Sequence, residues 1–409
     1  MIDIIDFNAR HVIEALRSGI SSREVGYCFS SARPKIMREI DSALAKVADE
    51  SFAGGMVISG KYGEGKTHLL NTVFNMAQER NMAVSLVSLS KETPFDKLYT
   101  VYSKIVQNTY LPGRLQPGFE HIFENMTLKS PLASELCEYC LKDFETNKLY
   151  YVLKSYLGTE NMDEKFMLLA DMEGDFMPNA EIRKIYGRIY SEKVNYNANF
   201  VKSRHTWDYF AFLNNLFLKS GYNGWVILFD EAELIGRMSK KARLNCYLNM
   251  SKFIYPAHNT TANLKSIYSI FAFNSSFIPD VIEGKLEYDN IEQNPVSPEA
   301  DRNIKTVLDL ISTAPQLIPL NNEEILSILE KIQDFHGKAY NWKPNIETAA
   351  LFSATEKRGY LLRTRIRAAV EILDQLYQYG KAGNIVINEL GQADYSENLP
   401  SLESIIDGD

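Results

Sequence analysis

The chain has 409 residues, of which 45% are hydrophobic and 23% are charged, as in ordinary globular proteins. This composition excludes a wholly disordered, collagen-like or coiled-coil chain, and the length predicts two or three domains. The 44 basic and 52 acidic residues give a net charge of −8, which excludes wholesale electrostatic attraction to nucleic acid but allows a local basic stripe.

Two features of the sequence indicate where the protein acts. Unbroken apolar runs such as Trp225–Phe229 are far shorter than the ~18 residues that a membrane helix needs. The first residues, Met1–Asp6, carry acidic side chains where a signal peptide needs basic ones. We therefore expect a cytoplasmic protein that does not contact a membrane.

The cysteines predict neither a disulfide framework nor a metal site. Four cysteines are too few for a disulfide framework in a chain of this length. Cys137 and Cys140 form a C-x-x-C pair, but Cys28 and Cys246 do not supply the second pair that a zinc site would need. We interpret Cys137 and Cys140 as two thiols in a helix.

Helical periodicity and short apolar runs follow one another along the chain. Residues 1–40 predict an N-terminal helical segment, interrupted by a loop at 26–31. Apolar runs predict buried strands at 56–58, 83–89, 225–229 and 267–273, with a short fifth strand at 317–320. Continuous apolar strands that alternate with helices predict an α/β fold in which a parallel sheet is covered on both faces.

This alternation divides the chain into a core and added helical parts. Residues 41–112 and 200–320 carry the predicted strands and form the core. Residues 113–199 are rich in Glu, Tyr, Leu and Lys at helical spacing, which predicts a helical insertion. Residues 321–390 predict a helical lid, and residues 391–409 form an acidic tail.

A glycine-rich segment lies between the first predicted strand and an amphipathic helix. Residues Gly60–Thr67 match the phosphate-loop pattern G-x-x-x-x-G-K-[ST] at every fixed position. Glycines let the backbone turn tightly around one anion, and the helix N-terminus adds its positive dipole end. We expect Lys66 to bridge the β- and γ-phosphates and the Thr67 hydroxyl to ligate Mg²⁺. The predicted nucleotide-binding residues are Gly60, Gly63, Glu64, Gly65, Lys66, Thr67 and His68.

The third predicted strand ends in two adjacent acids, Asp230 and Glu231. We expect Asp230 to reach the magnesium ion and Glu231 to polarise an attacking water, which would permit hydrolysis as well as binding. Glu233 is a weaker candidate for this base because it lies further along the turn. The long separation between Lys66 and Asp230 independently requires an insertion in the core.

Two further polar residues complete the predicted site. Asn274 ends the fourth strand, where a short side chain can lie beside the γ-phosphate and hold the attacking water; the alternative is a residue that begins a turn. Arg363 is predicted to contact the γ-phosphate from the C-terminal helical region. Arg365 and Arg367 compete with it for this role, and a solvated basic helix face remains the alternative.

A basic cluster follows the two acids and comprises Arg237, Lys240, Lys241 and Arg243. Three interpretations of it stay open: an arginine finger for a neighbouring subunit, a nucleic-acid contact, and a solvated helix face. The run Asp230–Glu233 also resembles an acidic helicase motif. Too few residues follow it to build the second RecA-like domain that such a helicase needs.

Taken in chain order, the phosphate loop, the Asp230-Glu231 pair, Asn274 and Arg363 resemble the AAA+ class. Within this class they resemble the initiator-like group that includes the origin-recognition ATPases. More narrowly, the chain resembles the ATP-binding proteins of BREX-type phage-defence systems (BrxD-like). This narrower resemblance is carried by Ile13–Gly19, by Val84–Ser90 and by the stretch from Arg358 to Val370.

The resemblance implies an AAA+ P-loop core with a helical insertion and a C-terminal helical lid, and ATP with Mg²⁺ bound between core and lid. It also implies a switch or motor that acts with a DNA-processing partner such as a helicase or nuclease, and that meets DNA directly or through this partner. A homo-oligomer is compatible with it. The alternative function is a non-hydrolysing, ATP-dependent scaffold that docks such a partner. The stretch Phe29–Arg33 departs from the resemblance, because it lacks the glycine of a turn that relatives place near adenine.

Overall fold

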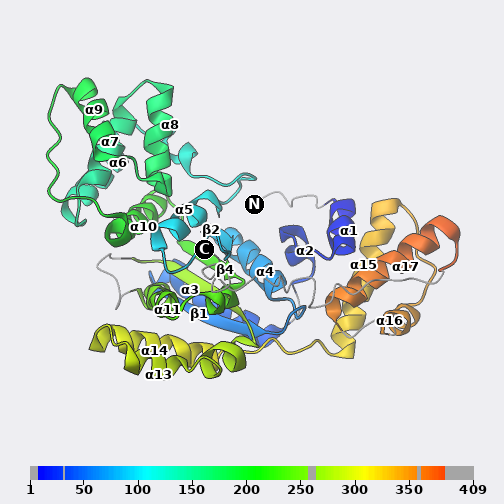
Figure 1. Cartoon of the computed structure of the whole chain (residues 1–409). Helices are drawn as coiled ribbons and strands as arrows, with labels where there is room; N and C mark the ends of the chain where they lie inside the picture. Colours follow the sequence, from blue (N-terminus) through cyan, green and yellow to red (C-terminus); the bar gives the residue numbers. More distant parts are fainter. Residues whose placement is uncertain (1–7, 31–32, 257–263, 357–360, 383–409) are drawn as a thin grey trace, which may run out of the picture. The chain divides into compact units, whose positions relative to one another are not determined.

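The computed structural model describes residues 8–30, 33–256, 264–356 and 361–382, in two units (Figure 1). Within these ranges the first unit runs from residue 26 to residue 319, and the second combines the residues before it with those after it. The predicted acidic tail 391–409 lies outside the described residues.

None of the described helices has both the length and the apolar character that crossing a membrane requires.

The first unit is built on a five-stranded sheet in the order β1-β5-β4-β2-β3. Its strands are β1 (Ala53–Gly60), β2 (Ala83–Ser88), β3 (Thr109–Tyr110), β4 (Trp225–Asp230) and β5 (Ile267–Asn274). The pairs β1–β5, β5–β4 and β4–β2 are parallel, and the short edge strand β3 pairs antiparallel with β2. The predicted α/β fold with a parallel sheet is confirmed.

The prediction of a fifth strand at 317–320 is wrong. The chain instead forms a single parallel bridge between Ser59 and Gln316 on the outer side of β1. The Ser59 amide donates to the Pro315 carbonyl at 3.0 Å, and the Leu317 amide donates to the Ser59 carbonyl at 2.7 Å. Pro319 has no N–H to donate two residues later, so the ladder stops there.

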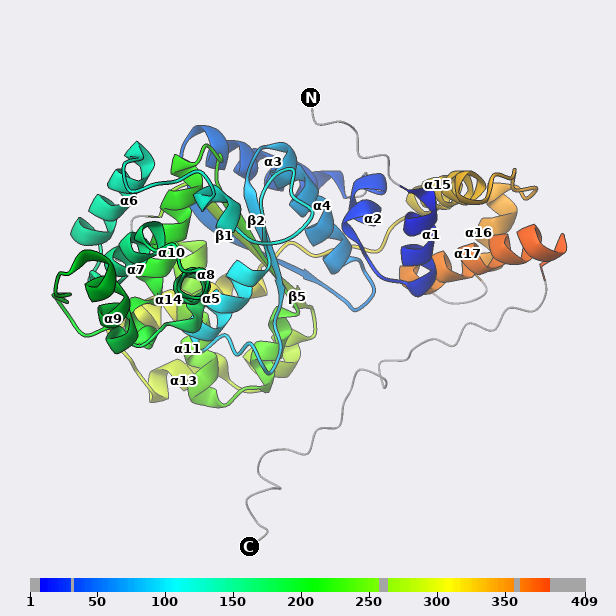
Figure 2. The same cartoon turned by 90° about the horizontal axis from the view of Figure 1, so that it is seen from above.

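Helices cover both faces of the sheet, because alternate side chains of each buried strand point to opposite faces (Figure 2). One face packs on α3 (Pro34–Asp49) and α4 (Lys66–Glu79), with Val226 and Leu228 of β4 in this core. The other face packs on α5 (Leu98–Gln107), α10 (Lys202–Lys219), α11 (Lys240–Ile254) and α14 (Pro298–Ser312).

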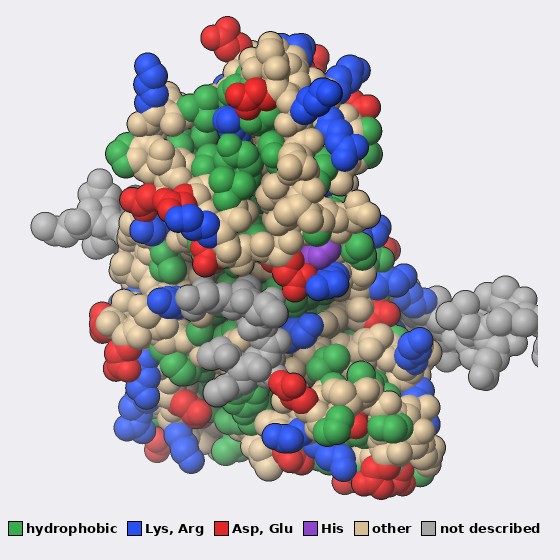
Figure 3. All heavy atoms as spheres, turned by 90° about the vertical axis from the view of Figure 1, so that its left-hand side faces the viewer, with side chains coloured by type: hydrophobic (Ala, Val, Ile, Leu, Met, Phe, Trp, Pro, Cys, Tyr) green, Lys and Arg blue, Asp and Glu red, His purple; other side chains and the backbone are tan. Residues whose placement is uncertain are grey.

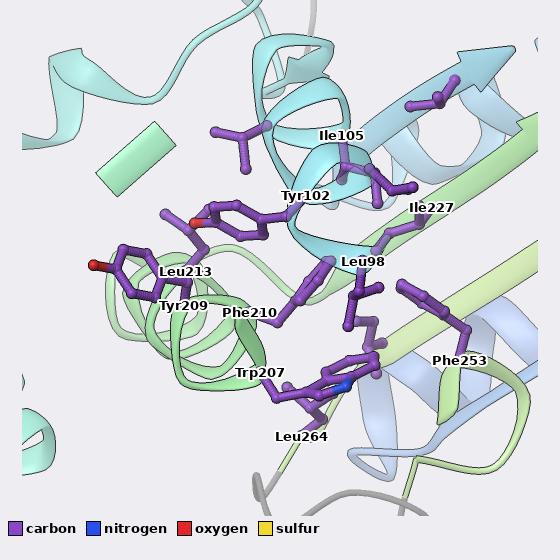
Figure 4. Close-up of a cluster of buried hydrophobic side chains, with 14 of the residues drawn as sticks. Leu98, Tyr102, Ile105, Trp207, Tyr209, Phe210, Leu213, Ile227, Phe253 and Leu264 are labelled. Carbon is purple, nitrogen blue, oxygen red and sulfur yellow. The ribbon is translucent and has the colours of Figure 1, made fainter. Parts of the chain in front are cut away.

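The core between the sheet and helices α5, α10, α11 and α14 contains many aromatic side chains (Figure 4). Tyr102 of α5 packs edge-on against Tyr209 and Phe210 of α10, and its hydroxyl donates to the Met172 carbonyl at 2.7 Å. The core continues into residues 113–199, whose helices therefore share it with the sheet. These elements are η1 (Glu120–Phe123), α6 (Pro131–Lys142), α7 (Lys148–Gly158), α8 (Met162–Ala170), η2 (Asp171–Asp175) and α9 (Asn179–Tyr190).

Three short elements follow the carboxyl ends of β4 and β5. The 3₁₀ helix η3 (Ala232–Arg237) comes after β4, while the π-helical η4 (Ile278–Glu283) and α13 (Glu287–Gln293) come after β5. They lie at the edge of the sheet to which the parallel strands point, where ligands of α/β sheets bind.

The second unit consists of α1 (Ala9–Ser18), α15 (Asn322–Tyr340), α16 (Thr348–Glu356) and α17 (Leu362–Tyr379). Arg17 of α1 forms two hydrogen bonds with Asp374 of α17 and one with the Tyr340 hydroxyl of α15. The predicted N-terminal segment 1–40 is thus split between the two units: α1 belongs to this unit, whereas α3 packs on the sheet of the first unit.

The loop predicted at 26–31 begins later than expected. Residues 26–28 belong to α2 (Arg23–Cys28). The Ser22 hydroxyl accepts a hydrogen bond from the Val25 amide at 3.2 Å, which satisfies an amide at the start of this helix. A short helix of six residues gives too little periodicity to be seen in the sequence.

Candidate functional site

The phosphate-loop segment connects β1 to α4 at the carboxyl edge of the sheet. Gly63 and Gly65 have φ angles of 79° and 88°, a left-handed conformation that favours glycine, and Gly65 is a fixed position of the pattern. The Glu64 carboxylate accepts a hydrogen bond from the Lys61 amide at 2.6 Å, so this side chain closes the loop on itself. The first amides of α4 have no acceptor within the helix, which suits an anion at this end.

Lys66 is buried, and its ammonium lies inside this loop. Its Nζ donates to the carbonyl oxygens of Gly60 at 2.9 Å and Lys61 at 3.3 Å. A buried ammonium that donates to neutral carbonyls suits an anionic ligand. The geometry therefore fits a phosphate group at this loop.

Thr67 and Asp230 meet at one point of the site. The Thr67 hydroxyl donates to the Asp230 carboxylate, with 2.6 Å between Oγ1 and Oδ2. Asp230 ends β4 and is buried, and its Oδ1 accepts from the Glu231 amide at 3.0 Å. A hydroxyl and a carboxylate are oxygen donors of the kind that Mg²⁺ prefers, so these residues fit that ion.

Asp230 reaches Thr67 although β4 is not the neighbour of β1. Strand β5 lies between them and pairs with both. Because all three strands are parallel, their carboxyl ends lie along the same edge of the sheet.

Glu231 and Glu233 lie close together after β4. Glu231 has a φ angle of 56°, a left-handed conformation that costs a non-glycine residue energy and often marks functional sites. Glu233 is half-buried, and burial together with the Glu231 carboxylate raises the pKa of Glu233 to about 7. Its Oε2 accepts a hydrogen bond from the backbone amide of Asn274 at 3.1 Å. This link between the two loops was not visible in the sequence.

Asn274 is the last residue of β5 and lies opposite Gly60 of β1 in the sheet register. Its side-chain oxygen accepts a hydrogen bond from the Ser276 amide at 3.1 Å. The side chain thus initiates a turn, the alternative that the sequence left open. Its position beside the phosphate loop is still the one that a water-holding residue would need.

The segment before α3 contacts the phosphate loop and its helix. The imidazole Nε2 of His68 lies 3.1 Å from the Phe29 carbonyl, and burial lowers the pKa of His68. The Arg33 guanidinium donates to the carbonyl of Glu64 and, at 3.4 Å, to that of Ile318. The stretch Phe29–Arg33 was noted in the sequence only for its missing glycine, and a contact of Arg33 with the phosphate loop was not predictable because it depends on how α3 packs on the sheet.

Arg363 lies near the start of α17, in the second unit. A Cβ atom added to Gly19 would lie 2.7 Å from its Nε, so Arg363 packs against the end of α1. The phosphate loop belongs to the first unit, and a contact of Arg363 with the γ-phosphate stays a prediction.

The members of the basic cluster, which begins at the last residue of η3, differ in how far they are buried. Arg243 is buried, forms an ion pair with Glu287 and donates to the Met238 carbonyl at 2.8 Å, so the solvated-face interpretation is wrong for this residue. Arg237 and Lys241 are exposed. On the face drawn in Figure 3, basic and acidic side chains of the described residues are interspersed.

Cys137 and Cys140 both lie on α6, as predicted, and burial raises the pKa of each thiol. Within the described residues, no three His, Cys, Asp or Glu side chains are arranged to hold a metal ion.

A family model described as "BREX system ATP-binding protein BrxC/D" matches residues 4–130 and 146–385. No curated protein matches the sequence. Among solved structures, a Walker-type ATPase of Pyrococcus abyssi matches with 13% identity and a TM-score of 0.33, covering 84% of this chain and 68% of that one.

Proposed function

Because the chain belongs to the BREX system ATP-binding protein BrxC/D family, we propose that it is a Mg²⁺-dependent ATPase of the AAA+ class. The observation that carries this proposal is the contact of 2.6 Å between Thr67 and Asp230 beside the buried ammonium of Lys66. Together these groups offer a phosphate-binding cation and two oxygen ligands at one edge of the sheet.

Each predicted residue has a role in this proposal. The loop backbone and Lys66 hold the phosphates of ATP, while Thr67 and Asp230 hold the metal ion. Bound there, Mg²⁺ would neutralise charge on the phosphate oxygens. Glu231 accepts the proton of the attacking water, so that a water oxygen bonds to the γ-phosphorus as the bond to the leaving ADP oxygen breaks.

The remaining predicted residues link the nucleotide to the rest of the chain. Asn274 holds the attacking water, and Arg363 contacts the γ-phosphate from the helical lid. Loss of that phosphate on hydrolysis then changes the lid and, through it, a partner.

The partner that we propose is a DNA-processing protein, a helicase or a nuclease, in bacterial antiphage defence. Membership of a BREX family supports a multi-protein system. The chain would meet DNA directly or through this partner, in the cytoplasm, alone or as a homo-oligomer.

The test is ATP turnover by the purified full chain, with Mg²⁺ and with the ion chelated. Glu231→Gln should bind ATP like the wild type but hydrolyse it at least ~100-fold more slowly, the usual contribution of a general base. Glu160→Gln, an exposed glutamate of the 113–199 segment, is the matched control and should leave turnover unchanged.

Two results would contradict the proposal. Equal turnover by Glu231→Gln and the wild type would remove Glu231 as the base. Tight ATP binding without turnover, even with DNA and partner present, would instead favour the non-hydrolysing scaffold.

A further inference from the structure

The end of β5 extends beyond the strand beside it. The pairing of β4 with β5 runs as far as Phe229 and Phe271, whereas β5 continues to Asn274. On the other side β5 stays paired with β1 up to the Gly60–Asn274 position. The last residues of β5 therefore have no strand partner on the β4 side.

Glu233 supplies a partner at this position. Its Oε2 accepts the Asn274 amide hydrogen bond at 3.1 Å, in place of a backbone carbonyl of β4. Glu233 comes from η3, which begins directly after Glu231. One carboxylate thus joins the segment of the proposed base to the residue proposed to hold the water.

The far end of η3 is also fastened to the segment after β5. The Lys285 ammonium donates to the Gly236 carbonyl at 2.7 Å. A Cβ atom on Gly236 would lie 2.6 Å from Cγ2 of Val281, so the backbone of η3 at Gly236 packs closely against the Val281 side chain. Arg243, paired with Glu287, holds the Met238 carbonyl at the end of η3. With both ends fixed, η3 has little freedom to move independently of β5.

We propose that Glu233 is a positioning residue of the ATPase site, which fixes the end of β5 and thereby the placement of Asn274 relative to Glu231. This inference depends on the proposed ATPase function. Glu233 acts through the Asn274 amide and does not touch the nucleotide. What the interaction requires is an acceptor oxygen at the right reach, and not a negative charge.

Three substitutions separate these requirements. Glu233→Gln keeps an acceptor oxygen at the same reach and loses the charge. Glu233→Asp keeps the charge but shortens the side chain by one methylene, and Glu233→Ala removes the acceptor. The measurements are kcat and KM for ATP, the Kd of a non-hydrolysable ATP analogue and the thermal unfolding midpoint of the full-length chain, with Glu160→Gln as control.

Glu233→Ala and Glu233→Asp should lower kcat by about 10- to 100-fold, as small misplacements of reacting groups do, with the Kd of the analogue unchanged. Glu233→Gln should keep kcat within about threefold of the wild type, because its amide oxygen still accepts the Asn274 hydrogen bond. A residue that only stabilises the fold would not be expected to give this result, in which glutamine retains kcat and the other variants lose kcat without any change in the Kd of the analogue. If Glu233→Ala does not fold, Glu233→Asp carries the same test.

Other outcomes would overturn the inference. If Glu233→Gln loses as much kcat as Glu231→Gln, then Glu233 is itself the proton acceptor. Unchanged kcat in Glu233→Asp and Glu233→Ala would mean that the hydrogen bond positions nothing. Both results require an active wild-type chain, whereas an inactive wild type would overturn the ATPase proposal and this inference with it.

Discussion

The hydroxyl oxygen of Thr67 lies 2.6 Å from a carboxylate oxygen of Asp230, although 163 positions separate the two residues in the chain. Thr67 follows β1 and Asp230 ends β4, and these parallel strands lie on either side of β5. Both residues are therefore at the same edge of the sheet. The contact joins the phosphate loop to the acidic end of β4, and these are the two halves of the predicted nucleotide site.

Thr67→Ala should therefore weaken ATP binding only when Mg²⁺ is present. Removing a ligand hydroxyl should cost at least ~10-fold in apparent affinity, the lower end of what altered metal shells cost. With the ion chelated, the loop backbone and Lys66 remain, and the variant should match the wild type. Titration of a fluorescent ATP analogue, with Mg²⁺ or with EDTA, measures both affinities.

Thr67→Ser is the control for this experiment, because it keeps the hydroxyl and should bind like the wild type. An equal loss of affinity by Thr67→Ala with and without Mg²⁺ would mean that Thr67 contributes to the loop and not to the metal.

The parts of the site that were predictable from the sequence depend on local patterns. Two glycines of the phosphate loop have left-handed backbone angles that few other residues adopt, so the loop is marked in the sequence itself. The strands are continuous apolar runs because both faces of the sheet are covered. Asp230 and Glu231 were found because they end such a run.

The parts that were not predictable depend on tertiary contacts. Arg33 meets the phosphate loop, and Glu233 meets Asn274, only after α3 and η3 have packed. Strand β3 has two residues, too few for any periodicity. Arg243 belongs to a run of basic residues and would be expected at the surface, but its partner Glu287 lies far along the chain.

Gly236→Ala should impair turnover more than it impairs ATP binding. The new methyl group would lie 2.6 Å from Val281 and 3.2 Å from Phe277, which forces η3 away from the segment after β5. Overpacking of this kind costs about 1–3 kcal/mol of stability. We expect kcat to fall about tenfold, with the Kd for ATP unchanged, in parallel measurements of turnover and analogue binding.

Gly187→Ala is the matched control, since Gly187 lies within α9 and the new Cβ would lie 3.6 Å from the Glu192 carbonyl oxygen, an ordinary van der Waals contact. It should leave turnover unchanged and stabilise the chain by about 0.5–1 kcal/mol through helix propensity. Normal turnover by Gly236→Ala would show that the close approach of the two loops is not needed.

Lys148→Met should destabilise the chain strongly. Lys148 and Asp171 are almost completely buried and form an ion pair at 2.6 Å, and Asp171 also accepts a hydrogen bond from the Tyr209 hydroxyl. Removing one partner leaves an uncompensated buried charge, which costs about 3–5 kcal/mol. Chemical denaturation of the full chain should show this loss, and the double variant Lys148→Met/Asp171→Asn should recover part of it.

The exposed pair Lys142–Glu138 provides the comparison on a neighbouring helix. Lys142→Met should be indistinguishable from the wild type, because exposed ion pairs contribute little. If the two lysine substitutions had equal effects, burial would not be the cause of the loss at Lys148.

Asp208→Asn should make the stability of the chain less dependent on pH. Asp208 of α10 is buried, its Oδ2 has no hydrogen-bond partner among the described residues, and burial raises its pKa to about 7. An unfolded aspartate titrates near ~3.9. Between about pH 4 and pH 7, the folded chain therefore holds a proton that the unfolded chain has lost, and the free energy of unfolding falls as the pH rises.

The asparagine side chain cannot ionise, so the part of the pH-dependent fall in the free energy of unfolding that Asp208 causes should disappear. The free energy of unfolding of Asp208→Asn, measured by denaturation at several pH values, should exceed that of the wild type by about 1–2 kcal/mol at pH 8. The difference should shrink towards pH 5, where wild-type Asp208 is itself neutral in the folded state. The exposed Asp143→Asn provides the control and should show no such trend. If the difference in the free energy of unfolding between the variant and the wild type stayed constant from pH 5 to pH 8, packing of the amide would be its cause. Only an ionising carboxylate makes this difference vary with pH.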